Sequence, residues 1–170
     1  MKKFVAILMV ALLALSTCAF AETYSREDIR FEYDANAFEI SMDDHTDDED
    51  LVILTGKNEA WGDTYIRIYL KDLDDGETFP TREELTVMPD ASEVIQDEWN
   101  GYKDVFMYDV ANEDGGITSF FIAPVMDDDG DEVEDLLSVE IGVSKIEDEE
   151  IAMERDDLIS AVVDSLSVND

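Results

Sequence analysis

Cysteine and histidine are nearly missing from this chain. Cys18 is the only cysteine among the 170 residues, and His45 is the only histidine. Because Cys18 lies near the N-terminus, the rest of the chain has no thiol for a disulfide, a thiolate nucleophile or a thiolate metal ligand. Every Ser–His arrangement would have to use His45, and neither a G-x-S-x-G motif nor a phosphate-binding glycine loop occurs. We therefore do not expect an enzyme.

Positive charge is also scarce. The chain has 11 Lys and Arg against 45 Asp and Glu, which gives a formal net charge of −34. Such a field repels phosphate backbones and anionic lipid, so we expect neither nucleic-acid nor anionic-membrane binding. Hydrophobic residues still make up 45% of the chain and fall in periodic segments, unlike those of a disordered acidic tail. The acids are therefore predicted to coat one folded, monomeric body. A protein adapted to a saline environment would have the same composition.

The N-terminus is typical of a cleaved signal peptide. Lys2 and Lys3 precede an apolar run from Phe4 to Leu15, and Ala19 to Ala21 form a small-residue cleavage site. The apolar run is shorter than the roughly 20 residues that a membrane-spanning helix needs. We therefore predict a signal peptide over residues 1–21 and a secreted or extracytoplasmic single domain over residues 22–170. An alternative remains open, because Leu15 to Cys18 resembles a lipobox that would anchor the protein through lipidated Cys18.

Strand signals follow one another after this segment, separated by acidic turns. Residues 64–71, for example, alternate Thr64, Ile66, Ile68 and Leu70 with more polar positions, as in a half-buried strand. The sequence Asn100-Gly101 between two extended runs predicts a tight hairpin, with Trp99 and Tyr102 stacked across it. Further strands are expected within residues 31–42, 51–57, 117–125 and 136–145, and the apolar run 117–125 is expected to be an interior strand.

Two helices are predicted. Thr81 and Glu84 form a capping box for a short helix, and Pro89 prevents it from continuing. The C-terminal segment has an apolar stripe of helical period, which predicts a long amphipathic helix. The expected fold is α+β: a central antiparallel sheet of about six to seven strands, flanked by one short helix and one long C-terminal helix.

The order of these segments resembles that of the PsbP-like family. The resemblance rests on the opening "FEYDANAFEISM", the "TREEL" helix, the hairpin meander and the closing "DLISAVVDSLSV", in which Asp164, Ser165 and Leu166 begin a short tail. It implies a sheet sandwiched by helices, and a role in binding partners rather than in catalysis. The stretch "MDDHTDDED" (residues 42–50) replaces a Tyr-Pro…Trp element of many bacterial relatives, so the role of that element does not carry over.

The acidic turns raise the question of calcium. EF-hand spacing fails at Gly76, Gly115 and Gly130, because apolar residues or Lys71 fall at ligand positions. A looser and weak Ca²⁺ site remains possible in the turn after residue 126, with the ligands Asp127, Asp129, Asp131 and Glu134. We expect no other cofactor.

The stretch "SMDDHTDDED" (residues 41–50) surrounds His45 with carboxylates. Asp43, Asp47 or Asp48 would be partners in a transition-metal site, but flexible hydrated carboxylates bind such ions weakly. We instead predict a hydrated connection with an exposed histidine, whose pKa the neighbouring negative charge raises.

Trp61 belongs to no alternating run and is placed at a turn tip. It is the candidate contact for a protein or glycan partner, unless it folds back over the sheet edge.

The overall prediction is an exported, non-enzymatic accessory or binding module with an unknown protein or envelope partner. The alternatives are a calcium- or cation-responsive protein and a hydrolase, which would need a buried carboxylate pair with separated pKa values.

Overall fold

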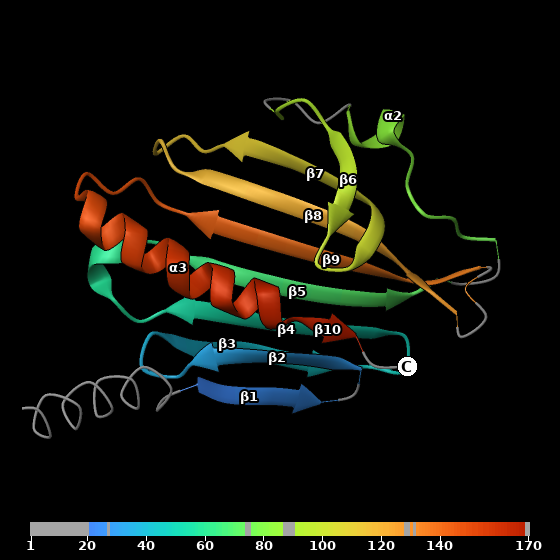
Figure 1. The fold of residues 1–170 in the computed structure, drawn as a ribbon, viewed down its shortest axis with the longest axis horizontal. Helices are drawn as coiled ribbons and strands as arrows, with labels where there is room; N and C mark the ends of the chain where they lie inside the picture. The colour runs from blue at the N-terminus through green and yellow to red at the C-terminus, as the bar shows by residue number, and fades with distance from the viewer. Residues whose placement is uncertain are drawn as a thin grey trace, which may run out of the picture.

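The computed structural model describes residues 21–26, 28–73, 76–86, 91–127, 130 and 132–168. Its largest element is an antiparallel seven-stranded sheet with the order β3-β4-β5-β9-β8-β7-β6, next to a three-stranded sheet with the order β1-β2-β10 (Figure 1). The strands are β1 (Ala21–Arg26), β2 (Ile29–Asp34), β3 (Phe38–His45), β4 (Glu49–Gly56), β5 (Tyr65–Asp72), β6 (Ile95–Trp99), β7 (Tyr102–Ala111), β8 (Ile117–Met126), β9 (Val133–Val143) and β10 (Ser167–Val168). The helices are η1 (Glu59–Trp61), α2 (Arg82–Leu85) and α3 (Glu149–Ser165).

The predicted α+β class, the seven-stranded antiparallel sheet and the long helix near the C-terminus are confirmed. Residues 117–125 fall within β8, an interior strand between β9 and β7. The capping box of α2 is also present, with Thr81 accepting the Glu84 amide and Glu84 accepting the Thr81 amide. Pro89 lies outside the described residues. The second, three-stranded sheet was not predicted, because only Tyr24 is buried in β1 and β10 is very short.

The inner face of the large sheet is covered by α3 and the small sheet. In Figure 1, α3 crosses in front of the strands, and β1 and β2 lie below it. Ile159, Val162 and Val163 of α3 join the main core with Phe31 of β2 and Phe38 of β3. The predicted amphipathic stripe of the helix therefore packs as expected, and the main core lies between these layers.

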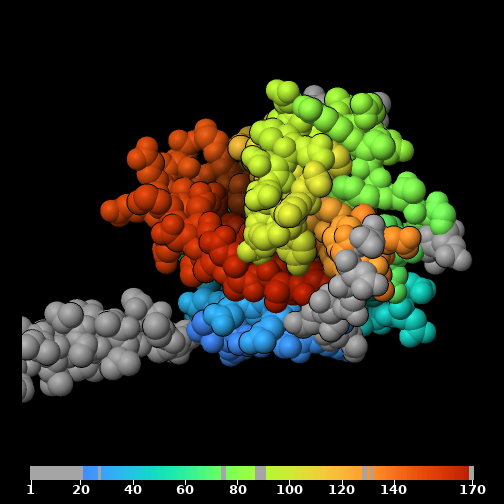
Figure 2. Space-filling model, turned by 45° about the vertical axis from the view of Figure 1, so that its right-hand side comes forward, coloured from blue at the N-terminus to red at the C-terminus, as the bar shows by residue number. Residues whose placement is uncertain are grey.

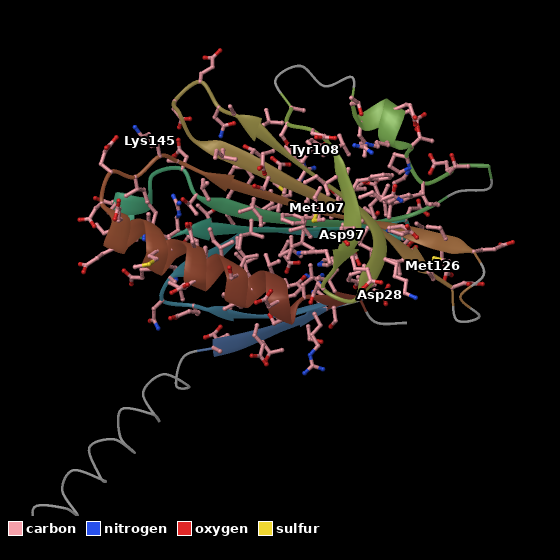
Figure 3. The ribbon with its side chains drawn as sticks, turned by 45° about the horizontal axis from the view of Figure 1, so that its top comes forward. Asp28, Asp97, Met107, Tyr108, Met126 and Lys145 are labelled. Atoms are coloured by element: carbon pink, nitrogen blue, oxygen red, sulfur yellow. The ribbon has the colours of Figure 1, made fainter. Side chains whose placement is uncertain are left out.

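A second core lies on the opposite, outer face of the sheet. Leu85 of α2 and Val94 pack there with Phe106 of β7, Ile122 of β8 and Tyr108. Met107 and Tyr108 are consecutive in β7 and belong to different cores, so their labels in Figure 3 mark strand positions that face opposite sides. Within the described residues, the segment around α2 thus covers the part of the outer face near β7, β8 and Leu136 of β9.

The predicted hairpin joins β6 to β7 and supports α3. Asn100 and Gly101 have φ angles of 49° and 87°, and the rings of Trp99 and Tyr102 are stacked with centroids 6.4 Å apart. The Asn100 side-chain amide donates to the carbonyls of Val163 and Leu166 at 3.1 and 2.7 Å, so it satisfies acceptors at the helix C-terminus. Figure 2 shows this hairpin standing over the C-terminal segment.

Candidate functional site

Residues 41–50 form a β-hairpin rather than the predicted hydrated connection. β3 continues to His45 and β4 begins at Glu49. Thr46 closes the turn, because its amide donates to the Glu49 carbonyl at 2.8 Å and its hydroxyl accepts the Glu49 amide at 2.9 Å. β3 is an edge strand of the large sheet, where charged side chains are readily tolerated. The density of acids therefore misled the sequence-based interpretation.

His45 is held between two carboxylates and is not exposed as predicted. Its Nδ1 lies 2.5 Å from Asp50 Oδ1, and its Nε2 lies 2.5 Å from Asp43 Oδ1. Only 7% of the histidine side chain is exposed. The Tyr24 hydroxyl, from β1, donates to Asp43 at 2.8 Å and lies 3.0 Å from His45 Nε2. Tyr24 connects this cluster to the small sheet, a pairing that the sequence did not indicate.

The cluster favours a charged histidine. Burial lowers the pKa of His45, but the hydrogen bonds to Asp50 and Asp43 outweigh it, so the pKa is raised overall. The predicted direction is thus confirmed. Burial raises the pKa of Asp43, yet hydrogen bonds from Tyr24, His45 and Arg26 hold it below its usual value. An imidazolium donating to both carboxylates matches these two directions.

A cavity of about 470 Å³ opens beside this cluster. It lies where the β1–β2 turn, the β3–β4 hairpin and the end of β5 meet, at the side of Figure 1 to which the β1 and β5 arrows point. Figure 3 labels Asp28 at this end. The lining is dominated by carboxylates, against one guanidinium and the His45 imidazole; the acidic residues are Asp28, Asp47, Glu49, Asp50 and Asp72. The sequence-based reasoning missed Arg26 and Asp28, because it placed no strand pair there.

A carboxyl pair lies next to the cavity. Asp72 of β5 and Asp135 of β9 are directly opposite each other in the sheet. Burial, the charge of Asp72 and a hydrogen bond with Asp72 raise the pKa of Asp135 to about 6. Asp72 lines the cavity, whereas Asp135 is not part of its lining. Carboxyl groups in hydrogen-bond contact differ from a glycosidase pair, whose members are about 5 Å or more apart.

The predicted calcium ligands are only partly described. Asp129 and Asp131 lie outside the described residues. The Asp127 carboxylate accepts the Glu132 amide at 3.1 Å, and the Glu134 carbonyl accepts the Leu73 amide at 2.9 Å. Within the part of the chain that the structure describes, no group of three or more His, Cys, Asp or Glu is arranged to hold a metal ion.

Trp61 is buried, so its prediction as an exposed partner contact is wrong. It is 2% exposed, and its ring centroid lies 5.6 Å from that of Phe38. A Cβ atom on Gly56 would lie 2.9 Å from the Trp61 ring, so the glycine makes room for it. The alternative, that Trp61 folds back over the sheet, is confirmed. The indole N–H is buried without a hydrogen-bond partner among the described residues.

No helix in the described ranges is long and apolar enough to span a membrane. The predicted signal peptide lies outside these ranges except for Ala21, which opens β1. No protein-family model matches the chain, and no curated protein matches it significantly. The resemblance to the PsbP-like family therefore stays a prediction from the order of the sequence segments.

Proposed function

We propose that the protein is an exported, non-enzymatic binding module whose acidic cavity receives a positively charged group of its ligand. One observation carries this proposal: five carboxylates line a concave site of about 470 Å³ and face a single guanidinium. Small-ligand pockets commonly measure about 300–1,000 Å³, so the volume suits a side chain or a small molecule.

The cavity already shows how a cation is held. The Arg26 guanidinium, which lines the cavity, lies 2.9 Å from Asp43 Oδ2, and half of the Arg26 side chain is exposed. His45 is engaged by Asp43 and Asp50. The exposed carboxylates of the lining are Asp28, Asp47, Glu49 and Asp72, of which Asp72 also contacts Asp135. An ammonium or guanidinium group of a ligand would find several carboxylates within reach. The net charge of −34 would also steer such a ligand toward the protein.

Binding has more support than hydrolysis. Both carboxyl groups of a carboxylate-pair hydrolase must face the substrate, whether they share a proton or lie about 5 Å or more apart as in glycosidases. Of the hydrogen-bonded Asp72–Asp135 pair, in contrast, only Asp72 lines the cavity. The raised pKa of Asp135 is explained by burial and repulsion within the sheet.

Isothermal titration with a tetralysine peptide tests the proposal. The variant D47N/D72N removes two cavity charges, and D63N/D157N removes two exposed charges elsewhere. Exposed ion pairs contribute roughly 0.2–1 kcal/mol each, so the cavity variant should weaken binding by about two- to thirtyfold. Equal weakening of tetralysine binding in both variants would show that the net negative charge of the protein, rather than the cavity, attracts the peptide, and it would refute the proposal.

A parallel titration with calcium chloride tests the alternative. Saturable micromolar calcium binding without tetralysine binding would favour a calcium-responsive protein. Export has its own test, which is N-terminal sequencing of the protein from its producing cell. A chain that begins at Glu22 supports the predicted signal peptide, whereas a lipidated Cys18 at the N-terminus supports the lipoprotein alternative.

A further inference from the structure

Part of the outer face of the large sheet has apolar side chains that join neither core. They are Met42, Leu51, Ile53, Tyr65 and Tyr69, which we call the outer patch. Met42 is 46% exposed, and the other four are partly exposed. Among the described residues, the apolar contacts of the segment around α2 are with β7, β8 and Leu136 of β9, and its Glu77 pairs with Lys71 of β5.

The strand register brings the outer patch together. Met42 pairs with Ile53 between β3 and β4, and Leu51 pairs with Tyr69 between β4 and β5. Opposite residues of antiparallel strands lie on the same face, about 4.5–5.5 Å apart. The Tyr65 ring lies against Gly142 of β9, where a Cβ atom would come within 2.1 Å of it. The patch therefore extends from β3 to the edge of β9, with Arg67 between its two tyrosines on β5.

The charges around the outer patch leave a negative excess. Arg67 and Lys71 are each within 4 Å of a carboxylate, Glu140 at 3.5 Å and Glu77 at 2.7 Å. On the β3 side, Glu39 and Asp44 pair across the sheet with Thr55 and Leu51 and so lie on the patch face. Among the described residues, neither of these two acids has a cationic partner within 4 Å.

We propose that the outer patch docks a basic amphipathic segment of a partner protein. Apolar side chains of the segment would cover Leu51 and Ile53, and its Lys or Arg side chains would meet Glu39 and Asp44. The Arg67 guanidinium, 5.9 Å from the centroid of the Tyr69 ring, already shows a cation placed over an aromatic ring of the patch. A second copy of this chain is disfavoured as the occupant, because two molecules that each have a formal net charge of −34 repel each other.

The size of the outer patch sets the expected strength of binding. Three strands about 4.8 Å apart, each contributing about six residues, span roughly 300 Å². Stable complexes bury about 800 Å² per partner. The docking is therefore a weak, transient contact, with a dissociation constant that is micromolar or larger. The patch lies on the sheet face, whereas the acidic cavity lies at the sheet end. The two sites can therefore be tested separately.

The test measures fluorescence anisotropy of a labelled helical Leu/Lys peptide of about 14 residues, which is four turns with one apolar face. The variant L51T/I53T removes apolar surface while keeping strand-forming residues. The variant I117T/M153T is the matched control, because Ile117 and Met153 are 46% and 62% exposed outside the patch. We expect at least about fivefold weaker binding for L51T/I53T and no change for the control.

Three results would overturn the proposal: equal binding by both variants, equal binding of a Ser/Lys peptide of the same charge, or binding to neutral lipid vesicles in place of the peptide. Thermal unfolding of each variant shows that it is folded. Tetralysine titration should be the same for L51T/I53T and the parent protein, so failure of this proposal is distinguishable from failure of the cavity proposal.

Discussion

Replacing Asp135 with asparagine should stabilise the protein at neutral pH. Asp135 has its pKa raised to about 6 by burial first and then by the charge of Asp72 across the sheet. A shift of about two units corresponds to roughly 2.7 kcal/mol, and solvent at this partly exposed position reduces it to about 1–2 kcal/mol. Asparagine removes the charge that is buried and repelled, and it keeps the shape of the side chain.

The sign of the pH dependence follows from the raised pKa. Well below the ordinary Asp pKa of 3.8, the carboxyl is protonated in both the folded and the unfolded chain, so no charge is penalised. As the pH rises toward 6, the unfolded chain releases the proton while the folded chain keeps it, and stability falls. Above pH 7 the loss is complete. The advantage of D135N should therefore be about half as large at pH 5 as at pH 8.

Urea unfolding at pH 5, 6, 7 and 8, followed by tryptophan fluorescence, measures this advantage. Trp61 is 2% exposed, so its emission reports loss of the main core. Removing any negative charge relieves some general repulsion in a chain of −34, so D63N is the necessary control at an exposed position. The reasoning is refuted if D135N gains no more than D63N at pH 8, or if its gain is the same at pH 5 and pH 8.

Three further changes test other parts of the structure. Asn100→Asp should lower the free energy of unfolding by about 1.5–3 kcal/mol. Two hydrogen bonds at the C-terminus of α3 lose their donor, and a negative charge is added there. The control N100G, which keeps the backbone freedom, should lower the free energy of unfolding by less in the same urea assay. Gly142→Ala should cost about 1–3 kcal/mol by thermal or urea unfolding, because its methyl group meets the Tyr65 ring; a similar cost in a Y65S background would contradict this contact. Asp50→Asn should lower the pKa of His45, measured as the titration of the single histidine resonance by proton NMR, and an unchanged midpoint would rule out the short contact.

Local signals in the sequence predicted much of the fold. Asn100-Gly101 requires positive φ at two consecutive residues, and Thr81 with Glu84 satisfies helix amides reciprocally, so each feature is determined within a few residues. The C-terminal stripe has helical period, and the helix is found there. The small sheet was missed because β10 pairs with β2 at a separation of more than a hundred residues, and only two residues form it.

The candidate site could not be derived in the same way. His45 was interpreted as exposed because six of the other nine residues in the stretch 41–50 are acidic, and a hydrated loop is the usual structure for such a run. What buries it is the pairing of His45 with Asp50 and the approach of Tyr24 from a different sheet. The Trp61 error has a similar origin: its burial depends on space left by Gly56 and on contact with Phe38, which only the folded chain brings together.

His45 also explains why the acidic residues beside the cavity can lie close together in the folded protein. Asp50 is 7% exposed, and a carboxylate this buried is costly unless it is paired and hydrogen-bonded. The imidazolium of His45 gives Asp50 and Asp43 a cationic partner that is also a hydrogen-bond donor. Through the hydrogen bond from Tyr24 to Asp43, the same cluster joins the β3–β4 hairpin to β1. Because the pKa of His45 is raised, this stabilisation is complete below about pH 6.5 and is lost as the pH rises through the folded-state pKa. Over the same range the cavity gains one negative charge. Rising pH should therefore strengthen the attraction of the cavity for a cation while it weakens the attachment of the β1 strand that forms one of its walls.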